Sequence, residues 1–174
     1  MRILITGIAG GGKTSIVRAL QEQGHQSFDL DDSGICAWVH RENGTTAKYV
    51  EGAGKEWIAA HRWQVIESRL IEQLESFNSH KNIYVGGKVA SNQVEAMAKM
   101  FDRIYLLQPD DSVIDERLAS RTSNTSNFGK KSEERQHLIE NRRGFEETYL
   151  AVGAIPIKNH GSIGEVLELI LTDY

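Results

Sequence analysis

The residues best able to do chemistry lie near the N-terminus, in the segment GIAGGGKT at positions 7–14. This segment matches the pattern G-x-x-x-x-G-K-[ST] in full, and its glycines let backbone N–H groups turn inward around phosphate oxygens. The lysine places a positive charge on the β- and γ-phosphates of a nucleotide, and the following hydroxyl reaches Mg²⁺. Lys13 is therefore expected to act in catalysis and Thr14 to hold the metal. The expected ATP-binding residues are Gly7, Gly10, Gly11, Gly12, Lys13, Thr14 and Ser15.

The elements on either side of this segment support the same interpretation. The apolar run Arg2–Thr6 is typical of a strand buried on both faces, and a helical pattern runs from Lys13 to Gln23. The positive end of that helix would point at the bound phosphate. The alternative is a glycine-rich turn with a surface lysine, which the strand–loop–helix order disfavours.

A second polar group, FDLDD at positions 28–32, follows the next expected strand. Ligands of open parallel sheets bind beyond the carboxyl ends of the strands, so Asp29 and Asp31 are expected to point toward the phosphate site. One carboxylate could hold Mg²⁺ through water, and the other could orient or deprotonate an acceptor hydroxyl. If extension continues past the strand, the two side chains share one side. The alternative is a polar turn, because aspartate is common in turns.

The order of these motifs resembles shikimate kinase and the related adenylate-kinase-like nucleoside and nucleotide kinases. In that group one aspartate lies near Mg²⁺ and a second binds the substrate hydroxyl, and by resemblance these map to Asp29 and Asp31. The pair Gly86-Gly87 is similar to a Gly-Gly-Gly whose backbone contacts substrate, with Lys88 in place of the third glycine. The aspartate that holds the metal in motor ATPases is missing from this strand end, which argues against that class.

Arginines extend the resemblance. Arg117 and Arg121 are four residues apart, on one face of an expected helix, and resemble the pair ahead of the lid in adenylate-kinase-like enzymes. We expect Arg117 to contact the nucleotide and Arg121 to act in catalysis, because fixed guanidinium groups neutralise charge on a migrating phosphoryl group. The polar, aperiodic segment 121–131 would be the lid.

Two further arginines are candidate substrate-binding residues. Arg143 lies shortly before Tyr149, as an arginine precedes a tyrosine in shikimate and nucleotide kinases, with its neighbour Arg142 as the alternative. Arg62 lies in a segment where these families often bind substrate, although its spacing departs from the shikimate kinase pattern.

Short apolar runs alternate with longer segments of helical period, which predicts an α/β fold with a parallel sheet. We expect a three-layer P-loop kinase fold in a single domain over residues 1–174, with five parallel strands, helices on both faces and a lid. A substrate-binding helical segment would span about 33–80, including one long helix from Trp57 to Phe77. Ser162 begins a capping-box pattern for the last helix. The expected strands are Arg2–Thr6, His25–Phe28, Asn82–Val85, Arg103–Leu107 and Ile155–Ile157.

Composition narrows the partners and the location. The net charge of −4 gives no general attraction to nucleic acid or to an anionic membrane, and no apolar stretch approaches the ~20 residues of a membrane span. The single cysteine, Cys36, allows no disulfide within the chain and favours a reducing compartment. We expect a cytoplasmic monomer or homodimer that acts on a small molecule, with no nucleic-acid or membrane partner.

Taken together, these patterns predict an ATP-dependent kinase, a phosphotransferase that uses Mg²⁺ and moves the γ-phosphoryl group to a hydroxyl or phosphate of a small metabolite. The alternative is a regulatory protein that binds or hydrolyses ATP without a small-molecule acceptor. A kinase acting on nucleic-acid ends is a third hypothesis, and the acidic net charge weighs against it. Shikimate, gluconate, a nucleoside and a nucleotide all remain open as the acceptor.

Overall fold

Five parallel strands form the central sheet, in the order β2-β6-β1-β7-β8. This computed structural model describes residues 1–48, 55–120, 131–159 and 162–173. The five strands expected from the apolar runs are confirmed, each to within one residue at either end. Their bounds are β1 Arg2–Thr6, β2 Gln26–Asp29, β6 Ile83–Gly86, β7 Arg103–Gln108 and β8 Ile155–Lys158.

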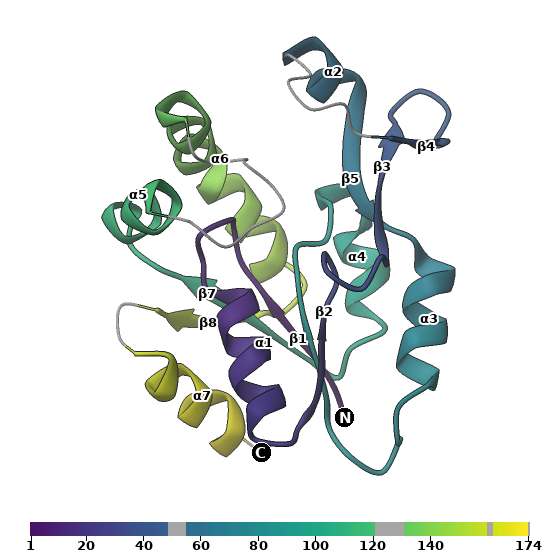
Figure 1. Cartoon of the computed structure of the whole chain (residues 1–174), viewed down its shortest axis with the longest axis vertical. Coiled ribbons are helices and arrows are strands. Elements are labelled where there is room, and N and C mark those ends of the chain that lie inside the picture. The colour runs from purple at the N-terminus through teal and green to yellow at the C-terminus, as the bar shows by residue number, and fades with distance from the viewer. Residues whose placement is uncertain (49–54, 121–130, 160–161, 174) are drawn as a thin grey trace.

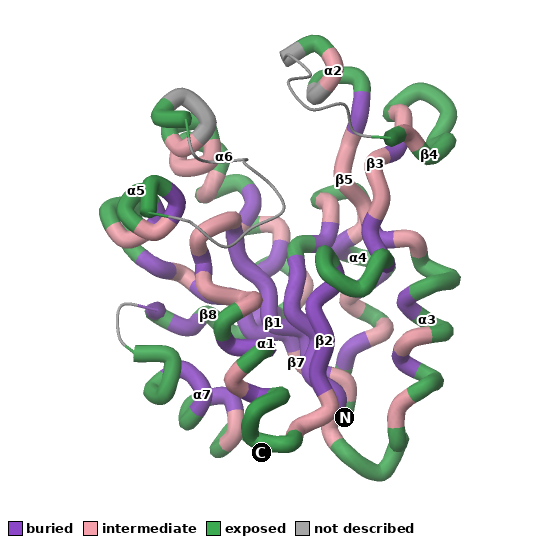
Figure 2. Tube along the Cα trace, in the orientation of Figure 1, coloured by how far each residue is buried: buried purple, intermediate pink, exposed green. Residues whose placement is uncertain are grey.

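The central sheet is buried on both faces, because its strands are nearly continuous apolar runs. Ile3 and Ile5 of β1 belong to one hydrophobic core and Leu4 belongs to the other, as the alternation of side chains along a strand requires. Figure 2 shows the central strands buried, while the outer sides of the surrounding helices are exposed. Each fully buried Ile or Leu stabilises the fold by about 1.5–3 kcal/mol.

Helices cover both faces of this sheet (Figure 1). On the side of Ile3 and Ile5, α1 (Lys13–Glu22) packs against α7 (Ile163–Thr172). Buried side chains from the helices of the opposite side join Leu4 in one core. These helices are α3 (Glu67–Glu75), α4 (Val94–Ala98), α5 (Asp111–Ala119) and α6 (Ser132–Leu150). The expected three-layer arrangement is confirmed. None of the helices in the described part of the chain combines the length and apolar character that a membrane crossing needs.

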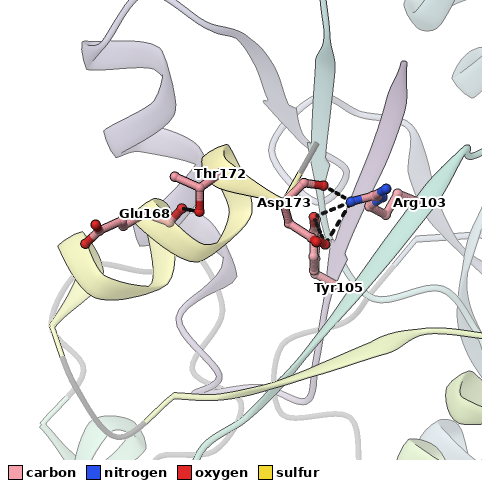
Figure 3. Close-up of polar contacts among 5 residues, drawn as sticks. All are labelled: Arg103, Tyr105, Glu168, Thr172 and Asp173. Atoms are coloured by element: carbon pink, nitrogen blue, oxygen red, sulfur yellow. Dashed lines mark hydrogen bonds and ion pairs between the residues drawn. The ribbon is translucent and has the colours of Figure 1, made fainter.

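Side chains fix both ends of α7. At its start, the Ser162 hydroxyl accepts a hydrogen bond from the Glu165 N–H and the Glu165 carboxylate accepts one from the Ser162 N–H, which confirms the capping box. Beyond its end, Asp173 accepts a hydrogen bond from the Tyr105 hydroxyl (2.9 Å) and pairs with Arg103 (2.8 Å), as Figure 3 shows. Burial, with the Asp173 carboxylate, raises the pKa of Tyr105 to about 12. These contacts tie the last helix to β7.

A second, antiparallel sheet lies beyond the carboxyl ends of the central strands and corrects one expectation (Figure 1). The single helix expected from Trp57 to Phe77 is wrong, because α2, β5 and α3 divide this segment. The segment at about 33–80, expected to be helical, therefore contains a sheet in the order β4-β3-β5. The three strands are β3 (Cys36–His40), β4 (Thr46–Ala47) and β5 (His61–Val65), and the short helix α2 (Lys55–Ala60) lies between β4 and β5 in the sequence.

Cross-strand pairing explains why this segment is not one helix. Trp63 of β5 lies opposite Trp38 of β3, and Val65 lies opposite Cys36. Aromatic and β-branched side chains favour strands, and directly opposed pairs are the unit that stabilises a sheet. The helical spacing in the sequence holds only for the second half of the segment, where Leu70 and Leu74 form the buried face of α3.

The expected lid, at about 121–131, falls almost wholly outside the described residues, and Arg121 lies outside them too. A short 3₁₀ turn, η1 (Ser91–Gln93), precedes α4. It follows the carboxyl end of β6 and lies close to the site described next.

Candidate active site

The phosphate-binding loop connects the end of β1 to the start of α1. Gly10 and Gly12 have φ values of +81° and +89°, which only glycine adopts without strain. Gly12 is the N-cap of α1 and brings no capping side chain, so the first N–H groups of the helix face the loop. The Lys13 ammonium donates to the carbonyls of Gly7 (2.9 Å) and Ile8 (3.0 Å), which holds its charge over the loop. Ser15 follows in the first turn and is exposed.

The hydroxyl of Thr14 and the carboxylate of Asp29 meet at the start of α1. Thr14 Oγ1 donates to Asp29 Oδ2 at 2.7 Å, and Asp29 is almost fully buried. A hydroxyl and a carboxylate are oxygen ligands of the kind Mg²⁺ prefers, and Mg²⁺ usually binds through one or two such groups plus substrate phosphates and waters. The residues present therefore fit a magnesium ion at this place. The described residues contain no cluster of three or more His, Cys, Asp or Glu side chains suited to a metal.

Asp31 faces a different partner from Asp29. The strand ends at Asp29 and the next residues form a turn, so the extension on which a shared side depended does not continue to Asp31. Asp29 Oδ1 accepts the Asp31 N–H at 2.9 Å, which fixes the turn. Asp31 Oδ1 accepts the indole N–H of Trp63 at 2.7 Å, so the second sheet holds this carboxylate.

Gly86 and Gly87 serve packing in this structure. A Cβ on Gly86 would lie 2.3 Å from Val17 Cγ2, and one on Gly87 would lie 2.6 Å from Leu30 Cβ. Their backbone groups are also engaged, since the Gly86 carbonyl accepts the Leu30 N–H and the Gly87 N–H donates to Ile5. The glycines let α1 and the turn after β2 approach β6 closely. The expected backbone contact with substrate stays a prediction.

We expect Gly86→Ala to lower the free energy of unfolding by about 1–3 kcal/mol, the usual cost of forcing extra atoms into a packed core. Gly144→Ala is the matched control, because a Cβ there would meet no atom within 4 Å and the residue lies inside α6. In a helix interior that change should raise the free energy of unfolding by about 0.5–1 kcal/mol. Urea denaturation measures both variants, and equal stability of the two would contradict the packing role of Gly86.

Two further side chains hold the loop from outside. Arg117 of α5 lies beside it, with Nη1 3.4 Å from the Gly10 carbonyl, and its contact with a nucleotide stays a prediction. Asn159, just after β8, is buried and its amide donates to the Gly11 carbonyl at 2.7 Å. No sequence motif marks Asn159. Its place beyond the carboxyl end of a central strand was the available signal.

Asn159→Ala would leave the Gly11 carbonyl without this donor in a buried position. We expect the free energy of unfolding to fall by about 1–3 kcal/mol, and ATP to bind more weakly because the loop is less ordered. Asn82→Ala is the control, since the Asn82 side chain accepts an exposed hydrogen bond from the Met1 amino group and its loss should change stability by less than about 0.5 kcal/mol. Denaturant titration and calorimetric ATP titration give the two readouts. Unchanged ATP affinity in Asn159→Ala would exclude the ordering role.

The structure does not bring the other candidate arginines together at the loop. Arg143 is exposed and pairs with Glu147 on the outer side of α6. Arg142 pairs with Glu146 and with Asp111 of α5, both at 2.6 Å. Arg62 donates to Gln64, and both lie on the face of β5 opposite to Trp63.

A cavity of about 280 Å³ opens between the loop, the end of β6 and α6. Lys88 lines it, with Nζ 5.3 Å from the centre of the Phe145 ring. In the sequence, Lys88 stands out only because it replaces the third glycine of a Gly-Gly-Gly motif. In the structure, it lines the cavity next to the phosphate-binding loop. The full lining is Ile8, Lys88, Ser91, Leu138, Asn141, Gly144 and Phe145.

Cys36 is not available as a nucleophile. It is buried in β3, and burial, together with the negative charges of Asp31 and Asp29, raises the pKa of its thiol. A thiol without thiolate character is inert, so Cys36 is a packing residue.

Comparisons with known proteins agree with this geometry. The protein-family model described as "AAA domain" matches residues 3–139, which include the phosphate-binding loop, Asp29 and Lys88. No curated protein gives a significant match to the sequence.

Solved structures share the fold at low identity. Shikimate kinase from Acinetobacter baumannii in complex with shikimate aligns with a TM-score of 0.62 and 21% identity, over 99% of this chain and 93% of that one. Shikimate kinase from Bacteroides thetaiotaomicron gives 0.61 and 16%, over 98% of each chain. Deoxyadenosine kinase from M. mycoides with bound dATP gives 0.58 and 14%, over 98% and 97%. With its phosphate-binding loop at the switch from β1 to α1, the chain has the fold of the P-loop small-molecule kinases and belongs to the AAA domain family.

Proposed function

We propose that the protein is an ATP-dependent kinase that transfers the γ-phosphoryl group to a hydroxyl or phosphate of a small metabolite. The observation that carries the proposal is that the two aspartates at the end of β2 have different hydrogen-bond partners. Asp29 is bonded to Thr14 beside the phosphate-binding loop, and Asp31 is bonded to Trp63 of the second sheet. One carboxylate thus serves the metal and nucleotide, while the other faces the place for an acceptor.

In this proposal the chain contributes positioning and electrostatics, since phosphoryl transfer needs little covalent help from the protein. Lys13 holds the β- and γ-phosphates, and Arg117 lies close enough to the loop to contact the nucleotide. Thr14 and Asp29 hold Mg²⁺, which when bound neutralises charge on the phosphates. Asp31 orients the acceptor hydroxyl and takes up its proton.

The remaining predictions complete the proposal. Arg121 supplies charge to the migrating phosphoryl group, and the segment 121–131 closes over the nucleotide. Arg62, Gly86, Gly87 and Arg143 remain candidates for substrate contact, the second sheet with its helices contributes the acceptor side, and residues 1–174 act as one domain. Such an enzyme would work in the cytoplasm as a monomer or homodimer.

A screen of γ-phosphoryl transfer tests the proposal. The protein, radiolabelled ATP and Mg²⁺ are incubated with a panel of hydroxyl-bearing and phosphorylated metabolites, and labelled products are separated. The expected result is transfer to one chemical class of acceptor. ATP hydrolysis that no acceptor stimulates would instead favour the regulatory ATP-binding protein.

A further inference from the structure

Lys88 has surroundings that suit a bound anion. Its side chain is exposed and lines the cavity of about 280 Å³, where the ammonium lies beside the apolar ring of Phe145. Desolvation by the surrounding atoms lowers the pKa of the ammonium, and the negative charge of Asp31 opposes this. Among the described residues, no carboxylate lies within ion-pair distance of Lys88. An ammonium at the mouth of a cavity, with no ion-pair partner among the described residues, can pair with an anion that binds there.

The loop that carries Lys88 is held in place by α6. The Tyr149 hydroxyl, which is buried, accepts a hydrogen bond from the Val89 N–H at 3.0 Å and lies 3.3 Å from the Val89 carbonyl. Burial raises the pKa of Tyr149 to about 12, so the hydroxyl stays protonated. The backbone next to Lys88 is therefore anchored, which fixes the point from which the Lys88 side chain reaches the cavity.

The helix opposite leaves space for a ligand. Leu138, Asn141 and Phe145 share the face of α6 that lines the cavity, together with Gly144. Glycine inside a helix costs about 0.5–1 kcal/mol relative to alanine, and here its absent side chain keeps the cavity open. Ser91 and Asn141 add polar groups, while Ile8, Leu138 and Phe145 offer apolar contact for a carbon skeleton.

The candidate arginines pair with other side chains or lie away from the cavity. Arg142 makes two ion pairs, with Asp111 and Glu146, and Arg143 lies on the outer side of α6. Arg62 lies on the far face of the second sheet. Among the described residues, Lys88 is thus the cation that lines the cavity between the phosphate-binding loop and α6.

We propose that Lys88 binds a carboxylate or phosphate group of the phosphoryl acceptor in this cavity, and that the enzyme therefore selects a small anionic metabolite. The proposal rests on the proposed kinase function and names the substrate class of the same site. The anionic group would lie at Lys88, with Ser91 near it, and the reacting group would lie toward Asp31.

Matched ligand pairs test this inference by binding as well as by turnover. Hydroxycarboxylic acids are compared with their primary amides, and sugar phosphates with the unphosphorylated sugars, by calorimetry with Mg²⁺ and a non-hydrolysable ATP analogue. We expect at least one anion to bind the wild type roughly 10- to 100-fold more tightly than its neutral partner, as loss of a charged hydrogen bond predicts. Which of the two pairs responds identifies the carboxylate or the phosphate.

Three variants assign the effect to the cavity. Lys88→Gln should abolish the preference for the anion and leave the affinity for the ATP analogue within about two-fold, because in this proposal its charge binds the acceptor and not the nucleotide. Lys81→Gln, at the exposed opposite end of β6, is the matched control and should keep the preference. Gly144→Leu fills the cavity with Lys88 intact and should weaken anion binding roughly ten-fold or more, the order of a lost buried contact.

The outcomes separate this inference from the proposed function. Transfer to an acceptor whose binding does not depend on Lys88 would overturn the inference and leave the kinase standing. Anion binding that depends on Lys88, without transfer to any acceptor, would keep the site and overturn the kinase. Weaker binding of the ATP analogue to Lys88→Gln, with the anion preference unchanged, would assign Lys88 to the nucleotide and overturn the inference.

Discussion

Lys13→Ala is expected to fold normally and to lose phosphoryl transfer by roughly 10²–10³-fold, the usual loss when one preorganised charge or donor is removed from a transition state. The Lys13 ammonium lies on the carbonyls of Gly7 and Ile8, in the middle of the phosphate-binding loop. Phosphoryl transfer spreads negative charge over the γ-phosphoryl oxygens, and a fixed ammonium stabilises that charge without reorganising.

Lys99→Ala is the matched control for this prediction, because Lys99 is exposed at the end of α4 and contacts no part of the loop. Circular dichroism and thermal unfolding check that both variants fold, and radiolabel transfer measures the rate. If Lys13→Ala retained a turnover near that of the wild type, the loop would be a structural turn and the kinase proposal would fail.

The central sheet could be predicted because the patterns that indicate its strands involve residues close together in the sequence. Runs such as Ile3-Leu4-Ile5 are apolar at every position, which marks a strand buried on both faces, and glycine, lysine and threonine at fixed spacing mark the loop between β1 and α1. The capping box at Ser162 is equally local, since a cap is made within one helical turn. Each of these features depends on neighbours in the sequence.

The second sheet was missed because its strands are stabilised by pairing between residues far apart in the sequence. Trp63 lies in a strand because it pairs with Trp38. No residue spacing within β5 predicts that pairing. The same holds in the site. Asn159 bonds to Gly11, which is far from it in the sequence. Lys88 lines a cavity only because α6 packs against the loop after β6. A side chain that acts across long sequence separations carries no motif.

The two aspartates after β2 give the sharpest pair of variants, because their hydrogen bonds differ. Asp29 accepts one hydrogen bond on each oxygen, from Thr14 and from the Asp31 N–H. In Asp29→Asn one oxygen becomes an NH₂ group that faces a donor in a buried place. We therefore expect a loss of about 1–3 kcal/mol of stability together with a weaker response to Mg²⁺. Thermal unfolding and Mg²⁺ titration of turnover measure the two effects.

Asp31→Asn should behave differently, since the side chain is exposed and Oδ1 accepts from Trp63 in the described contacts. An amide oxygen can still accept that bond, so the fold and ATP binding should change little. The variant loses the negative charge and the basicity, and transfer to the acceptor should fall by roughly 10²–10⁴-fold, the contribution of a positioned general base. Asp32→Asn, at the exposed neighbouring position, is the control and should transfer normally. Normal transfer by Asp31→Asn would mean that the acidic pair only shapes the turn after β2, and the acceptor would then have to bind away from the second sheet.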